Sequence, residues 1–143
     1  MILGFTGTRH GMTDKHREMV RLLILKHVPT EARHGDCVGA DADFHDLIRK
    51  MRHAKDCLII GHVPLNGSIR ARCDFDREEI PLPYLLRNQK IVDACELLIV
   101  CPSGNERDSD QRHSGTWSCY RYAKRMNRKR VIVYPDGTMQ EEG

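Results

Sequence analysis

The chain has 143 residues, of which 40% are hydrophobic and 30% charged, and its formal net charge is +3. This length suits one domain with its own core, taken as residues 1–143, and leaves too little for two. The small net charge does not single out a nucleic-acid binder, which is usually more basic. No apolar run reaches the roughly 20 residues that a membrane helix needs, so no membrane partner is expected.

The six cysteines form no C-x-x-C pair and the eight histidines are scattered, so we expect neither a metal site nor a cofactor. Several cysteines lie inside apolar runs, as Cys101 does in "LLIVC", where a free cysteine behaves as a small buried hydrophobic residue. The chain begins with the strand-like run "MILGFTG" and shows no secretory signal. These features predict a cytoplasmic protein with reduced thiols.

The first half of the chain predicts strands that alternate with helices. Three short apolar runs indicate buried strands, the second of them weakly; they cover residues 2–5, 28–35 and 57–63. Thr13 is a suitable N-cap for a helix that runs to Lys26. A second helix is expected over residues 40–52, because one stripe of it is apolar: Ala40, Phe44, Leu47, Ile48 and Met51.

The second half continues the alternation after a polar stretch, residues 64–80, in which we expect a short strand near residues 68–73. Pro83 fits the first turn of a helix that reaches Ala94. The clearest buried strand follows, then a polar loop, a helix and the last strand; these cover residues 97–101, 102–115, 116–127 and 131–134.

Continuous apolar strands that alternate with helices indicate a parallel sheet covered on both faces. With right-handed crossovers, this predicts the α/β class: a doubly wound, mainly parallel, Rossmann-like sandwich. Ligands of such sheets bind beyond the carboxyl ends of the strands.

Three glycine-containing loops leave strand ends and enter helices: "TGTRHGMT" (6–13), "GDCVGAD" (35–41) and "PSG…RHSGTW" (102–117). Glycine lets a backbone approach a ligand closely, and the helix start that follows offers free amides to a phosphate. Neither G-x-x-x-x-G-K-[ST] nor G-x-G-x-x-G is present, which disfavours a P-loop ATPase or an NAD dehydrogenase. We expect a phosphate-bearing ligand at this edge.

The motifs "GFTGTR", "HGDCVGAD…H", "RNQKIV" before "LLIVCP", and "SGTW" follow one another in an order that resembles the SLOG superfamily over roughly residues 2–135. That group includes the DNA-processing protein A, the LOG-type nucleotide phosphoribohydrolases and the small YspA/YpsA-like proteins, and the last of these is the branch that we expect the chain to resemble. The resemblance implies a nucleotide or nucleotide-derived ligand. Relatives with this fold commonly pair through helices, which makes a homodimer a candidate assembly.

The resemblance also implies the site. Asp41 and His45 match the G-x-D-x-x-x-H of the DNA-processing protein, and their spacing puts them on one side of a helix, facing the crevice. Helix capping explains Asp41 equally well, and His45 could be a structural hydrogen-bonder. The ligand-binding candidates are Gly7, Thr8, Arg9, Gly35, Asp36, Gly39, Asp41, His45, Arg87, Asn88, Ser114, Gly115 and Thr116.

Arg87, in "LLRNQKIV", resembles the arginine that relatives use near the substrate. Its planar guanidinium could hold a phosphate at two points, and a structural ion pair is the alternative. Arg9 is expected to make a second phosphate contact, and Arg107 and Arg112 could close over a ligand. Trp117 and Tyr84 are expected to pack in the core.

"SGTW" stands where the phosphoribohydrolases carry P-G-G-x-G-T-x-x-E, and Cys119 occupies the position of the glutamate. This departure puts N-glycosidic cleavage by the family's usual route in doubt, because a thiol offers no carboxylate to stabilise a sugar cation. Asp36, Asp41 or Glu106 could supply the acid instead. Arg87 and Asp41 are the catalytic candidates if the protein is an enzyme.

Three functions therefore compete. The first is a nucleotide-binding sensor or carrier, which needs only the glycine loops and one or two arginines. The second is a nucleotide N-glycosidase that releases a free base. The third is single-stranded DNA binding through the basic stretch "RYAKRMNRKR" (121–130), ranked last because aromatic residues are few near it.

Overall fold

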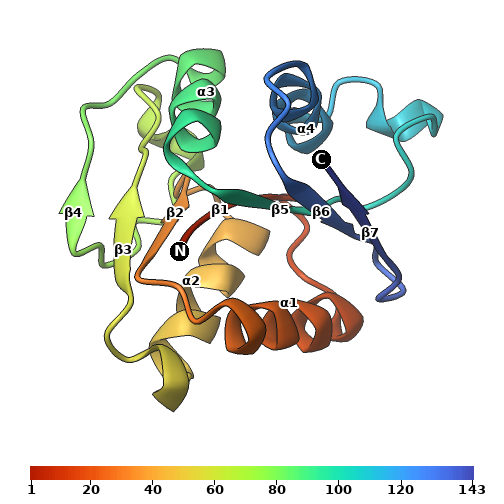
Figure 1. The fold of residues 1–143 in the computed structure, drawn as a ribbon. Coiled ribbons are helices and arrows are strands. Elements are labelled where there is room, and N and C mark those ends of the chain that lie inside the picture. The colour runs from red at the N-terminus through yellow and green to blue at the C-terminus, as the bar shows by residue number, and fades with distance from the viewer.

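The computed structural model describes residues 1–143 and contains a seven-stranded, mostly parallel sheet (Figure 1). The strand order is β4-β3-β2-β1-β5-β6-β7, and β7 alone runs antiparallel to its neighbour. The strands are β1 (Ile2–Gly7), β2 (Glu31–His34), β3 (Leu58–Gly61), β4 (Arg77–Glu78), β5 (Leu97–Cys101), β6 (Arg130–Val133) and β7 (Met139–Glu142). The order reverses between β1 and β5, which is where ligands of such sheets bind.

Four helices cover the sheet, two on each face (Figure 1). They are α1 (Asp14–His27) and α2 (Ala40–Lys50) on one face, and α3 (Tyr84–Ala94) and α4 (Gly115–Arg125) on the other. Each face has its own hydrophobic core, and all five residues of β5 are buried between them. The α/β, doubly wound prediction is confirmed. No helix has the length and apolar character to cross a membrane.

The start of α1 shows how local chemistry sets an element. Thr13 Oγ1 accepts the His16 amide (3.0 Å), and His16 Nδ1 accepts the Thr13 amide in return (3.1 Å). The two residues thus form a capping box in which histidine replaces the usual glutamate or glutamine. The predicted N-cap at Thr13 is confirmed.

The predicted strand over residues 68–73 is wrong. A single 3-10 turn, Gly67–Ile69, stands there instead, and the short edge strand β4 comes later. The amides of Ala71 and Cys73 are both bound to Asp36, through its carbonyl (2.8 Å) and carboxylate (2.9 Å) oxygens. The Ala71 bond belongs to one isolated antiparallel bridge, between Cys37 and Arg70, and the Asp36 carboxylate takes the Cys73 amide, so the pairing does not extend into a strand.

The strand near residues 131–134 is not the last. Residues 135–138 turn back, and Asp136 Oδ1 accepts the Thr138 amide (3.0 Å), so that the acidic end of the chain becomes β7. Glu142 on β7 forms a salt bridge with Arg130 on β6 (2.9 Å). The acidic C-terminal residues therefore form an edge strand of the sheet.

Candidate functional site

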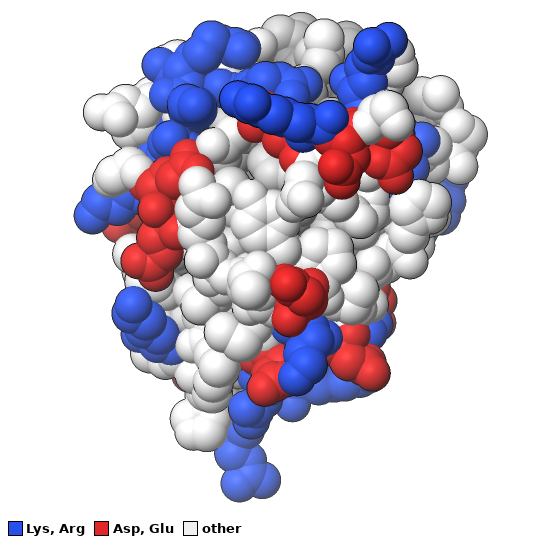
Figure 2. Space-filling model, turned by 90° about the vertical axis from the view of Figure 1, so that its right-hand side faces the viewer, with Lys and Arg blue, Asp and Glu red and all other residues white.

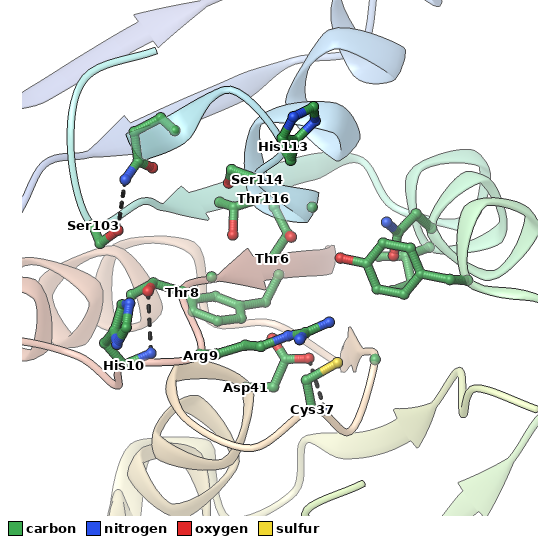
Figure 3. Close-up of a pocket in the computed structure, with 18 of the residues that line it drawn as sticks. Thr6, Thr8, Arg9, His10, Cys37, Asp41, Ser103, His113, Ser114 and Thr116 are labelled. Carbon is green, nitrogen blue, oxygen red and sulfur yellow. Dashed lines mark hydrogen bonds between the residues drawn. The ribbon is translucent and has the colours of Figure 1, made fainter. Parts of the chain in front are cut away.

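A pocket of about 410 Å³ opens where the strand order reverses, and all three predicted loops contribute to it (Figure 3). The ends of β1 and the β1–α1 loop, the β2–α2 loop and the segment before α4 line it, together with the first half of α3. Ten of the candidates lie in its wall: Gly7, Thr8, Arg9, Gly35, Asp41, Arg87, Asn88, Ser114, Gly115 and Thr116. Asp36, Gly39 and His45 do not.

Asp36 is fully buried beside the pocket and cannot reach a ligand. One carboxylate oxygen accepts the Arg70 Nε–H (2.7 Å) and the other accepts the Cys73 amide (2.9 Å). The residue adopts a left-handed conformation, with φ of 58°, which turns the chain towards α2. Its role is to hold the segment around residues 70–73 against the β2–α2 loop.

Gly39 is required by a close approach of two loops. Its φ of +95° suits glycine, and a β-carbon there would collide with the backbone of Arg9. The next amide, that of Ala40, donates to the Thr8 carbonyl (2.9 Å). The start of α2 is therefore joined to the β1–α1 loop and is not open to a ligand.

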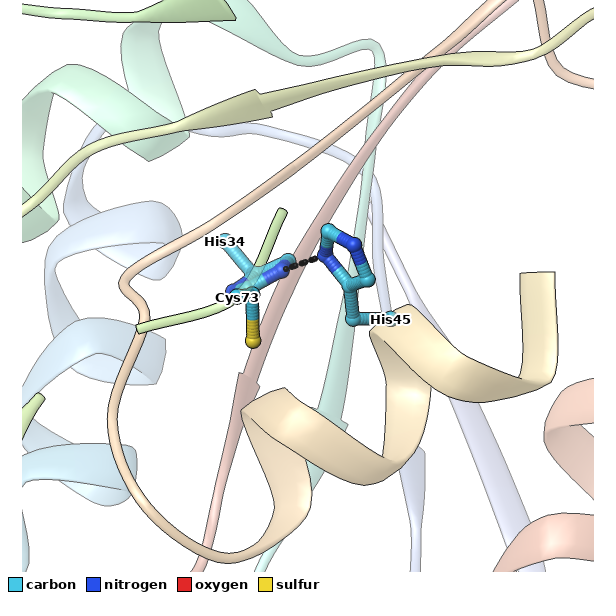
Figure 4. A group of neighbouring side chains, drawn as sticks. All are labelled: His34, His45 and Cys73. Atoms are coloured by element: carbon cyan, nitrogen blue, oxygen red, sulfur yellow. Dashed lines mark hydrogen bonds between the residues drawn. The ribbon is translucent and has the colours of Figure 1, made fainter. Parts of the chain in front are cut away.

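His45 points away from the pocket, towards His34 and Cys73 (Figure 4). His34 Nδ1 accepts the Asp36 amide (3.0 Å), so the His34 proton must lie on Nε2, which donates to His45 Nδ1 (2.9 Å). His45 Nε2 then donates to the Asp74 carbonyl (3.0 Å). The expectation that His45 faces the crevice is wrong, because this chain of hydrogen bonds holds its ring against His34 and the Asp74 carbonyl.

His34, His45 and Cys73 place their ligand atoms within 4.8 Å of one another, a cluster that the sequence spacing did not reveal. His45 is oriented as a metal ligand would be, with its second nitrogen donating to a carbonyl. His34 is not: to ligate through Nε2 it would need its proton on Nδ1, against the Asp36 N–H. The cluster therefore does not fit a metal ion and is better described as a hydrogen-bonded clasp.

Arg87 is almost fully buried, and its hydrogen bonds are committed to the protein. Nε donates to Asn88 Oδ1 (2.8 Å), and Nη1 donates to the carbonyls of Gly35 and His62, the latter at 3.2 Å. Nη2 lies 3.6 Å from Cys37 Sγ. Only Nη2 could still donate a hydrogen bond to a ligand. The expected two-point contact between the guanidinium group and a phosphate is therefore not available.

Asp41 lies in the first turn of α2 with its carboxyl group in the pocket wall. It is 5% exposed and accepts the Cys37 amide (3.1 Å). Burial raises the pKa of Asp41 to about 6, against the lowering effects of the Cys37 and Gly35 amides and of the Arg87 charge. It is a buried carboxyl group whose charge is only partly compensated.

The start of α4 offers unpartnered donors on the opposite side of β1 from Asp41 (Figure 3). Ser114 is the N-cap, and its Oγ accepts the Trp117 amide (3.3 Å). The amides of Gly115 and Thr116 have no backbone partner, as expected for the first residues of a helix. Such amides, aided by the helix dipole, suit an anion.

Arg9 is the cation that remains free at this pocket. It is exposed and forms no salt bridge. Thr8 Oγ1 accepts the His10 amide (3.2 Å), which shapes the loop on which Arg9 stands. Arg9, rather than Arg87, is therefore placed to neutralise a phosphate.

Tyr84 lines the pocket, whereas the sequence analysis assigned it to the core. Its ring lies beneath the Arg87 guanidinium, 4.9 Å from Cζ to the ring centre, and burial raises the pKa of its hydroxyl. Its contact with Gly115, 31 positions away along the chain, is one that the sequence does not show. Trp117 is a core residue as predicted, 1% exposed, and its indole N–H donates to the Gly104 carbonyl (3.3 Å).

Cys119 is buried in the α3–α4 core, where burial raises the pKa of its thiol to about 12, and it does not line the pocket. Glu106 pairs with Arg121 (3.2 Å) and lies outside the pocket as well. Of the three acids that could replace the missing glutamate, the structure places only Asp41 at the site. Asp110, which the sequence analysis missed, also lines it.

The segment before α4 is fixed to its surroundings and does not resemble a free flap. Gln111 is buried and donates to Ser103 Oγ (2.9 Å), and residues 109–111 form a 3-10 turn. Arg107 and Arg112 lie outside the pocket lining. These contacts do not favour the expected closure by the two arginines.

Charged residues of both signs alternate on the face shown in Figure 2. Lysine and arginine side chains gather towards the end of the molecule that carries α3 and α4, with acidic side chains directly beneath them. The middle of this face carries few charged groups. On this face the basic side chains do not form the continuous groove that a single-stranded nucleic acid would follow.

Comparison with known proteins identifies the fold. No protein-family model matches the chain. No curated protein matches it either. Among solved structures, the chain is similar to the X-ray structure of TM1055, a target of the Northeast Structural Genomics Consortium. The TM-score is 0.62 at 14% sequence identity, over 92% of this chain and 72% of that one. At this identity, the similarity shows the Rossmann-like α/β fold that the two chains share.

Proposed function

We propose that the protein binds a nucleotide or nucleotide-derived, phosphate-bearing small molecule in this pocket, as a sensor or carrier. The observation that supports this most is the meeting of three glycine-containing loops at one cavity beside the β1–β5 switch point. The cavity volume lies within the range of small-molecule sites. The SLOG resemblance, including its YspA/YpsA-like branch, points to the same class of ligand and belongs to the proposal.

The two sides of the pocket suit different parts of such a ligand. The amides of Gly115 and Thr116, with the free Arg9, would hold the phosphate. Asp41 and Tyr84 lie where hydroxyl groups of a sugar or polar atoms of a base could bind. A carboxylate accepts hydrogen bonds from hydroxyl or amino groups, and an aromatic ring gives a surface for a planar ring.

A nucleotide N-glycosidase is the second candidate, and Asp41 is the observation that favours it. A buried carboxyl group with a pKa raised to about 6 can give or take a proton near neutral pH. In this scheme Asp41 would protonate the departing base or activate the attacking water. Single-stranded DNA binding and pairing of two copies remain weaker proposals, supported by the sequence resemblance.

The experiment is a thermal-shift screen of AMP, GMP, CMP and UMP, followed by chromatography of each mixture for free base. A ligand at about a hundred times its Kd stabilises a protein by ~2.7 kcal/mol, which such a screen detects easily. A shift without product supports the sensor, and release of free base supports the glycosidase. If none of these compounds, nor ribose 5-phosphate, shifts the melting temperature, the proposal is wrong.

Arg9→Ala tests the site, with Arg21→Ala as the matched control. Both arginines are exposed, but Arg21 lies on α1 and does not line the pocket. We expect the Arg9 variant to lose most of the ligand-induced shift and the Arg21 variant to keep it. Equal behaviour of the two variants would place the phosphate elsewhere.

A further inference from the structure

We propose that Asp41 takes up one proton when the pocket binds its anionic ligand, which presupposes the proposed function. The protonated carboxyl group then carries no negative charge in the cavity that holds the anion. The site would be a proton-coupled anion site, and its affinity would rise as the pH falls. The proton comes from the solvent, so ligand binding removes protons from the buffer.

The geometry around Asp41 leaves its negative charge weakly compensated. The side chain is 5% exposed, and the groups that stabilise its charge by hydrogen bonding are two backbone amides, those of Cys37 and Gly35. No lysine or arginine forms a salt bridge with it. Arg87 is the cation with the largest effect on it, and three of its bonds go to Gly35, His62 and Asn88. Arg9, the free cation that lines the same pocket, acts on the neighbouring Cys37.

The other titratable groups around Asp41 do not relieve this charge. Asp36, from the β2–α2 loop, adds a negative charge, although Arg70 pairs with it. The thiols on which the Asp41 charge acts all have a pKa raised by burial and stay neutral: Cys37 of the same loop, Cys73 of the 70–73 segment, Cys101 of β5 and Cys119 of α4.

A bound phosphate or sulfate would place a second negative charge in the same small cavity. A like charge disfavours ionisation of a carboxyl group, and the effect is large where water is excluded. The pKa of Asp41 already lies at about 6 without a ligand. A further rise would make the protonated form dominant near neutral pH, and a protonated carboxyl group can donate to an anion.

The test is a titration with inorganic sulfate, which stays dianionic throughout, followed through the backbone amide resonances of Gly115 and Thr116. We expect sulfate to bind on the order of tenfold more tightly at about pH 5.5 than at about pH 8, which corresponds to a shift of one pKa unit. Asp41→Asn carries a neutral amide instead. We expect this variant to bind sulfate with the tighter affinity at both pH values.

His10 and His113 also line the pocket, and histidine can change charge in the same pH range. The double variant His10→Gln, His113→Gln separates their contribution from that of Asp41. The proposal requires this variant to keep most of the pH dependence and Asp41→Asn to lose it. The opposite pattern overturns the proposal.

Calorimetry of sulfate binding to the unsubstituted protein in two buffers of different ionisation enthalpy gives a second readout, which does not depend on a variant's folding. Near pH 6.5, midway between the free and bound pKa values, a shift of one unit corresponds to an uptake of roughly half a proton, and we expect the heat to differ between the buffers accordingly. Binding without proton uptake overturns this proposal alone. If no anion binds at any pH, the proposed function fails as well.

Discussion

The phenolic hydroxyl of Tyr84 occupies the space that a β-carbon on residue 115 would need. Residue 115 is glycine, and it begins α4 directly above the pocket. The first residues of α3 and α4 are therefore in contact at the site, and the contact is possible because residue 115 has no side chain. The contact fixes the position of the α4 amides that we assign to the phosphate.

Gly115→Ala should therefore destabilise the protein through a clash with Tyr84, by about 1–3 kcal/mol, the usual cost of overpacking. In a Tyr84→Ala background the clash is absent, and the same substitution should cost close to nothing. Urea denaturation of the two single variants and the double variant gives the coupling free energy. Additive free energies would show that the two residues do not touch.

Arg87→Ala should lower the free energy of unfolding by about 2–4 kcal/mol, because it leaves the buried carbonyl groups of Gly35 and His62 without donors. Arg87→Lys should recover only part of this loss, since an ammonium group lacks the planar fork. The exposed Arg21→Ala should stay within about 0.5 kcal/mol of the parent. A stable Arg87→Ala that fails to bind ligand would instead restore Arg87 as the phosphate contact.

Stability should fall as the pH drops below about 6.5, the pKa of histidine in an unfolded chain. Burial lowers the pKa values of His34 and His45, and that of His62 to about 4. Below pH 6.5 the unfolded chain therefore binds protons at these histidines, whereas the folded protein leaves them neutral. Each such histidine costs ~1.4 kcal/mol per pH unit within that window. Urea midpoints between pH 7.5 and 5.5 should show the decline.

Asp41 acts against this trend, because its folded pKa of about 6 lies above that of an unfolded aspartate. The folded protein gains a proton there first, which stabilises it as the pH falls. Asp41→Asn should therefore steepen the loss of stability between pH 6.5 and 5. A parallel curve for the variant would indicate that Asp41 keeps an ordinary pKa.

Asp36→Asn should loosen the segment that carries Cys73, because it removes the charge that pairs with Arg70. We expect faster reaction of Cys73 with a thiol reagent, followed by mass spectrometry of the labelled peptides. Cys119, in the α3–α4 core, is the internal control and should stay unreactive in both proteins. Unchanged labelling of Cys73 would mean that other contacts hold the segment.

Much of the architecture could be predicted, because buried strands and helix starts each require particular residue types within a few positions of one another. The run Leu97–Cys101 is apolar throughout, which a strand covered on both faces requires, and the structure buries all of it. Thr13 marks a helix start through a hydrogen bond to an amide three residues away. The same local reasoning placed three loops at one edge, because parallel strands bring their carboxyl ends together.

The site residues were harder to predict than the fold, because a polar side chain can form hydrogen bonds with residues that are distant in the sequence. Helical spacing puts Asp41 and His45 on one side of α2, yet only Asp41 reaches the pocket, since His45 bonds to His34 and to the Asp74 carbonyl. The segment near residue 70 lost its predicted strand in the same way, to Asp36.

The sequence by itself determined the alternation of the five central strands with the four helices, the mainly parallel sheet and the edge at which the glycine loops gather, because each depends on apolar pattern and short-range turns. It did not show the two edge strands, β4 and β7. Only the tertiary structure decided the role of Arg87. Its guanidinium bonds to Gly35, which lies 52 positions away along the chain. A buried cation binds whichever acceptors the fold brings beside it, and in this protein the backbone supplies most of them, which leaves Arg9 as the unpaired cation at the pocket.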